Sequence, residues 1–156
     1  MSHIALEQYA RLLLLLHTAG AIVLVGASTH HFLIALGYLR GHFKVRLGRI
    51  YAITVAITYG LTFLLGGLVY PSFRYLVRGL YLDRYDVWAS TVFEMKENLA
   101  VLGLGMAMGA LILSRTMDPS LDRHTRWGYA VFVFTQTAVV WFNVLSGLLI
   151  TMAKSV

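Results

Sequence analysis

The chain has 156 residues, of which 58% are hydrophobic and 13% charged, and its formal net charge is +6. This composition lies outside the range of soluble globular proteins and is typical of an integral membrane protein. The sequence has no cysteine, which excludes disulfides, thiolate metal sites, covalent haem attachment and thiol redox catalysis. The thirteen Lys and Arg residues are spread over short segments between apolar runs, which favours a role in membrane topology and argues against nucleic-acid binding.

Four uncharged apolar runs follow one another, at residues 12–39, 50–73, 98–114 and 127–153. Each is near the length of a membrane-spanning helix, since a bilayer core of about 30 Å needs about 20 residues. The runs do not alternate with a period of two, and four are too few to close a membrane barrel. We therefore predict an all-α integral membrane protein with a single domain over residues 1–156. Its four transmembrane helices should form a bundle and cover residues of about 9–40, 50–71, 93–115 and 127–153.

The segment between the second and third predicted helices has a different pattern. Pro71 is expected to end the second helix, and residues 73–81 place apolar side chains opposite Arg74 and Arg78. We predict an interfacial amphipathic segment here, with its tyrosines and Trp88 at the level of the lipid headgroups. Arg74 and Arg78 are also candidate donors to an anionic ligand.

Glu94 and Glu97 begin the third predicted helix and share one of its faces. They border the same interface as Arg74 and Arg78, so we predict an ion pair between the two groups. The alternative is a proton-carrying carboxylate beside a quinone or another cofactor. In the fourth helix, Gln136, Asn143 and Ser146 lie on one face, which we expect to point into the bundle and form interhelical hydrogen bonds.

The distribution of basic residues predicts the orientation. Residues 40–49 hold four Lys and Arg and no acid, and residues 115–126 hold three with two Asp. These two loops share one side, whereas most basic residues of the opposite side are accompanied by acids. Because Lys and Arg are enriched in cytoplasmic loops, we predict an inner-membrane protein of a bacterium with both termini outside the cytoplasm.

Three histidines lie inside the first predicted helix. Fourteen residues advance a helix by about 1400°, about 40° short of four turns, so His17 and His31 share a face and lie about 21 Å apart. His30 points about 140° away from His17. Gly20, Ala27 and Ser28 are small residues on the face between His17 and His31, and they leave room for a flat group against the helix.

This arrangement resembles the two-haem helices of membrane b-type cytochromes, in which one helix offers a histidine to each of two stacked haems. The string His17-Thr18-Ala19-Gly20-Ala21 is also similar, and the resemblance covers residues 17–31. It implies haem b on His17 and His31 beside Gly20, with Arg74 and Arg78 neutralising propionates at one surface.

The opposing haem ligands are open at this point, because the other three predicted helices contain no histidine. The candidates are His3, His42 or His124, a methionine, a water, or the same histidine of a second copy. A homodimer pairing the first helices about a twofold axis would set each histidine opposite its own copy. A partner subunit could replace the second copy.

The sequence therefore favours a haem b electron-transfer protein, or the haem-bearing subunit of a respiratory complex, with the lipid bilayer and other membrane subunits as partners. One alternative is a non-catalytic structural or assembly subunit of a larger membrane complex. A third is a small metal or proton transporter that uses the His and Glu side chains. Whether the protein is an enzyme stays open, and an electron-transfer or accessory role is favoured over a stand-alone enzyme.

Overall fold

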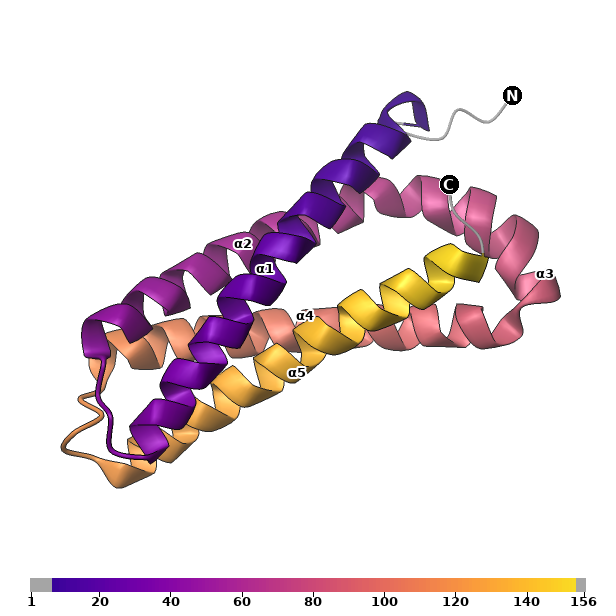
Figure 1. The fold of residues 1–156 in the computed structure, drawn as a ribbon. Coiled ribbons are helices and arrows are strands. Elements are labelled where there is room, and N and C mark those ends of the chain that lie inside the picture. Colours follow the sequence, from indigo (N-terminus) through magenta and orange to yellow (C-terminus); the bar gives the residue numbers. More distant parts are fainter. Residues whose placement is uncertain (1–6, 154–156) are drawn as a thin grey trace.

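The computed structural model describes residues 7–153, and within that range every regular element is a helix. Four helices are long, and shorter turns precede or connect them (Figure 1). In chain order the elements are η1 (Glu7–Tyr9), α1 (Ala10–Leu39), α2 (Val45–Ser72), η2 (Phe73–Leu82), α3 (Asp83–Tyr85), α4 (Val87–Thr116) and α5 (Arg123–Ala153).

The four long helices form a bundle in which α1 packs against α2 and α5, and α4 packs against the same two helices. The α1–α2 and α4–α5 connections lie together at one end, which we call the loop end (Figure 1). The ends of the described chain and the α3 turn lie at the opposite end, which we call the terminal end. The two loops predicted to share one side therefore do so.

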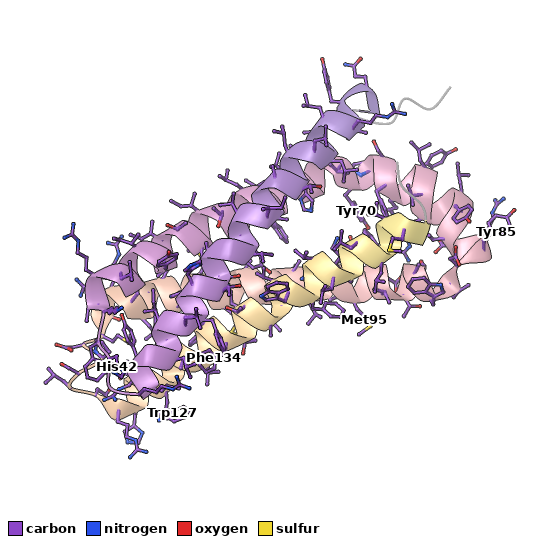
Figure 2. All side chains as sticks on the ribbon, viewed as in Figure 1. His42, Tyr70, Tyr85, Met95, Trp127 and Phe134 are labelled. Carbon is purple, nitrogen blue, oxygen red and sulfur yellow. The ribbon has the colours of Figure 1, made fainter. Side chains whose placement is uncertain are left out.

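All four helices are long and apolar enough to cross a membrane. Large apolar side chains remain exposed on the outside of the bundle, among them Leu15, Leu64 and Leu148. Exposed aromatic side chains occur near both ends, with Tyr85 at the terminal end and Trp127 at the loop end (Figure 2). Trp88 is also exposed and lies in the first turn of α4. This surface matches the apolar belt and aromatic borders of membrane proteins. The all-α prediction with four apolar helices is confirmed.

The third helix begins at Val87, not at residue 93. The starts of the second and fourth helices differ from the predicted ones because those predictions stopped at charged residues. The second helix begins at Val45, not at residue 50, and the last begins at Arg123, not at residue 127. Their first turns carry Arg46, Arg49 and Arg126, which a helix tolerates where it extends past an apolar core.

The prediction that Pro71 ends the second helix is wrong. Pro71 lies inside α2, and helical structure continues through wider π turns of η2 to Tyr85. Proline removes one backbone donor and crowds the carbonyl one turn earlier, but its side chain is exposed here and the residue one turn earlier is Gly67. The chain reverses instead at Asp86, which has a non-helical backbone between α3 and α4.

Small residues let the helices approach closely in the bundle. A Cβ atom on Gly103 of α4 would lie 2.1 Å from the Tyr59 hydroxyl of α2, and one on Gly48 would lie 2.1 Å from the Tyr38 hydroxyl of α1. Ala35, Ala110 and Tyr129 are buried together nearer the loop end. Helix association in membranes depends on such close packing because lipid chains are as apolar as leucine side chains.

Candidate functional site

The terminal half of the bundle contains a layer of polar side chains, one from each long helix: His17 of α1, Thr62 of α2, Lys96 of α4 and Asn143 of α5. Each lies about 26 to 33 Å from the loop end of its helix, at about 1.5 Å per residue. We call these four residues the polar layer. Polar groups at this depth are costly unless they have a partner or a function, so the layer is the strongest candidate site.

His17 is fixed in one orientation. Its Nδ1–H donates a hydrogen bond to the Thr62 carbonyl, with 2.9 Å between the atoms. Gly66 makes room for the ring, because a Cβ atom there would lie 3.1 Å from Cε1 of His17. A carbonyl can only accept, so the proton is on Nδ1 and the lone pair of the neutral ring is on Nε2. Within residues 7–153 Nε2 has no hydrogen-bond partner. A histidine that ligates a metal through Nε2 is held in this same way.

Lys96 brings a positive charge to the polar layer. Its side chain crosses to α5, where a Cβ atom on Gly147 would lie 3.2 Å from Nζ. No hydrogen bond or salt bridge from Lys96 exists in the described part of the chain. This cation is therefore free to neutralise a carboxylate of a bound molecule.

Two further atoms of the polar layer are buried without a hydrogen-bond partner among residues 7–153, namely Thr62 Oγ1 and Asn143 Oδ1. The Asn143 amide group donates to the Val139 carbonyl at 2.9 Å, which leaves its oxygen as an acceptor. Gln136, two turns from Asn143 on the same face of α5, is fully buried, and neither of its amide atoms has a partner in the same range. The polar face predicted for α5 thus points into the bundle. The interhelical hydrogen bonds expected from it are absent among the described residues, because the Asn143 and Ser146 side chains donate to carbonyls of α5 itself.

His31 is arranged differently from His17. Its ring is fully buried, and Nε2 lies 2.6 Å from the Tyr129 hydroxyl of α5. The two rings also meet edge to face, with centroids 5.6 Å apart. This hydrogen bond occupies Nε2 of a histidine expected from the sequence to face a haem.

The space expected beside Gly20 is also occupied. A Cβ atom on Gly20 would lie 2.8 Å from Thr62 Oγ1, so this glycine serves the close approach of α1 and α2. A flat group against the helix at Gly20 does not fit this packing.

The other histidines lie away from the polar layer. His30 is exposed and its Nδ1–H donates to the Gly26 carbonyl at 2.8 Å, in agreement with the prediction that it faces away from His17. His42 and His124 are exposed at the loop end. His3 lies outside the described residues.

The two arginines proposed as anion donors lie in η2 at the terminal end. Arg78 forms salt bridges with Glu94 and, at 3.5 Å, with Asp83. The predicted ion pair between an arginine and a glutamate of this group is therefore present. Arg74 is exposed and donates to the Tyr70 hydroxyl at 3.1 Å. Arg78 thus links η2 to α3 and α4. Of these two arginines, Arg74 is the one that forms no salt bridge within residues 7–153.

The polar layer contains one histidine that could serve as a haem ligand. Among the described residues no group of three or more His, Asp or Glu could hold a bare metal ion. A haem iron needs only one or two protein ligands, because the porphyrin supplies four. His17 offers a free, oriented Nε2 and Lys96 a cation for a propionate, whereas His31 offers no free Nε2. Of the two histidines expected to ligate haem, His17 therefore has an available Nε2 within residues 7–153 and His31 does not.

Comparison with known proteins finds no match to this chain among protein-family models, curated proteins or solved structures.

Proposed function

We propose that this protein binds haem b in the membrane through His17 and transfers electrons, as a homodimer or as the haem-bearing subunit of a respiratory complex. The observation that carries the proposal is the orientation of His17. Its Nδ1–H is bonded to the Thr62 carbonyl, and its Nε2 has no partner within residues 7–153. A bound haem would supply one-electron redox chemistry.

The remaining residues of the polar layer have supporting roles. The Thr62 carbonyl keeps the imidazole in one tautomer and one orientation, and such partners raise the basicity of a ligating nitrogen. Lys96 would neutralise a propionate by a charge-assisted hydrogen bond. A second copy or a partner subunit would provide the second axial ligand, because the other described histidines lie in the loop half of the bundle or in its loops.

We further propose that the protein resides in the inner membrane of a bacterium, with the terminal end outside and the loop end in the cytoplasm. Seven Lys and Arg lie in residues 40–49 and 115–126 against two Asp, and enrichment of this kind is characteristic of cytoplasmic loops. Labelling of single cysteines from outside the cell tests the orientation. Cysteine at position 86 should react and cysteine at position 44 should not; the reverse pattern would show that the orientation is inverted.

A second candidate is a non-catalytic structural subunit of a membrane complex. The specific observation in its favour is that polar side chains of different helices are paired with one another. His31 is bonded to Tyr129, and Arg78 is bonded to Glu94 and Asp83. Such pairs hold helices together and require no cofactor.

Absorption spectra of three variants separate the two candidates. His17→Ala should remove the haem absorbance, and imidazole added to this variant should restore part of it by occupying the emptied ligand position. His30→Ala is the matched control, because His30 is on the same helix but faces away from the polar layer. Its spectrum should equal that of the wild type. Lys96→Ala should retain haem and shift its reduction potential downward, since a positive charge nearby stabilises the reduced form. Equal absorbance in His17→Ala and His30→Ala would leave the structural candidate standing.

A further inference from the structure

A groove on the outside of the bundle, at the loop end, is not used by the proposed function. It has a volume of about 300 Å³ and lies between α1 and α2, with the α1–α2 connection at its rim. Figure 2 shows His42 of this connection at the loop end. The lining residues are His30, Leu33, Ile34, Gly37, His42, Lys44, Leu47 and Tyr51.

The groove has two chemically distinct parts. Leu33, Ile34 and Leu47 form an apolar wall, while His42 and Lys44 form a polar rim toward the loop end. His30 and Tyr51 stack with ring centroids 5.6 Å apart and planes 4° apart, which gives the deep end of the groove a flat, rigid surface. A ligand with a polar head at the rim and a hydrocarbon tail along the wall would match both parts.

The rim has an excess of positive charge. Arg40, Lys44 and Arg46 are exposed, and residues 40–49 contain no acid. The salt bridges found within residues 7–153 are at the terminal end, so none neutralises this group. A second hollow, of about 620 Å³, shares Lys44 and Leu47 with the groove and adds Arg46 to the same surface. The positive end of the α2 dipole, which has no side-chain cap, adds to the attraction for an anion.

We propose that this groove binds an anionic phospholipid. Its phosphate lies at the rim beside Lys44 and Arg46, and an acyl chain follows the wall formed by Leu33, Ile34 and Leu47. The charge of the rim and the apolar wall below it select a lipid that is anionic and not merely amphiphilic. Basic pockets between transmembrane helices near a membrane surface bind the headgroups of acidic lipids in this manner.

Native mass spectrometry of the full-length protein tests the proposal. The protein is released from nanodiscs that contain equal amounts of phosphatidylglycerol and phosphatidylcholine, and the lipids that remain bound are counted. We expect phosphatidylglycerol to be retained preferentially. The double variant Lys44→Ala/Arg46→Ala should weaken its retention about 25-fold, since each basic residue near a membrane surface contributes about five-fold.

The matched control is Arg74→Ala/Arg84→Ala, which removes the same charge from exposed positions at the terminal end. It should retain phosphatidylglycerol as the wild type does. Leu33→Trp keeps every basic residue but fills the apolar wall from an exposed position, so it should also lose the lipid. Retention in Leu33→Trp, equal loss in both double variants, or no preference for phosphatidylglycerol would each overturn the proposal. Displacement of the lipid by 10 mM inorganic phosphate alone would overturn it too, because the acyl chain would then contribute nothing.

Discussion

The hydrogen bond between His31 and Tyr129 links α1 to α5 inside the bundle, and its removal should destabilise the protein measurably. Tyr129→Phe deletes only the hydroxyl at 2.6 Å from Nε2. Since Nδ1 of His31 is already buried without a partner among the described residues, both ring nitrogens would then lack one. Interhelical hydrogen bonds in membranes average about 0.6 kcal/mol and reach about 1.7 kcal/mol. The short distance and complete burial of this pair favour the upper part of that range, so we predict a loss of about 1.5 kcal/mol.

The assay is reversible unfolding of the purified protein in mixed micelles with increasing SDS, followed by circular dichroism. A double-mutant cycle with His31→Leu isolates the pair, and its coupling energy should be about 1 kcal/mol. Tyr51→Phe is the control, because Tyr51 stacks on His30 and its hydroxyl makes no hydrogen bond within residues 7–153. A difference between Tyr129→Phe and Tyr51→Phe below about 0.3 kcal/mol would refute the structural role assigned to His31.

Three other predictions concern packing, the terminal end and the α4–α5 loop. Gly103→Ala should lower the free energy of unfolding by about 1 to 3 kcal/mol in the same assay, because the added Cβ atom meets the Tyr59 hydroxyl. Gly105→Ala is the control; its Cβ atom would have open space, so the free energy of unfolding should not fall. Arg78→Ala should speed hydrogen exchange in η2 more than Arg84→Ala does, because it removes the salt bridges to Glu94 and Asp83; equal exchange would contradict this role. Hydrogen bonds from the Thr125 hydroxyl and the His124 N–H lower the pKa of Asp122. The stabilisation from such a carboxylate is present above its unfolded pKa and is lost as pH falls through its folded pKa. The protection of the His124 amide, measured as its exchange rate relative to the intrinsic rate at each pH, should therefore fall below about pH 4; the same fall in Asp122→Ala would refute the assignment.

Much of the fold is predictable from the sequence because apolar runs of spanning length have few alternative structures. The bounds were less predictable. The second helix was predicted to begin after the last charged residue of its loop, but α2 includes Arg46 and Arg49, where the helix extends past the apolar region. Pro71 was expected to end a helix, and its exposed position allows the helix to continue. Both differences depend on the surroundings of a residue, which a local pattern does not contain.

The site was predictable only in part. Helical geometry correctly placed His30 apart from His17, but a helical angle does not identify the group opposite each ring. The partner of His31 is Tyr129, which is 98 positions away in the chain. His17 and His31 share one face of α1, but different residues of other helices lie opposite them. Their roles therefore differ.

Lys96 was not predicted as a site residue, because it stands between Glu94 and Glu97 at the charged start of the third predicted helix. A signal for it does exist in the sequence. Ala100, Gly103, Ala107 and Ala110 follow at the spacing of one helix face, and the structure buries the last three of these. Extending that stripe by one turn toward the N-terminus places Lys96 on the same inward face.

The reduced-minus-oxidised absorption spectrum of the purified wild-type protein, combined with a haem-to-chain ratio, tests the central claim most directly. We predict a b-type spectrum with no more than one haem per chain, because His17 is the histidine of the polar layer and its Nε2 has no hydrogen-bond partner within residues 7–153, whereas the Nε2 of His31 is bonded to Tyr129. A colourless protein from cells with ample haem would contradict haem binding altogether. A ratio of two haems per chain would contradict the role assigned to His31, since that histidine would then have to leave Tyr129 and bind iron.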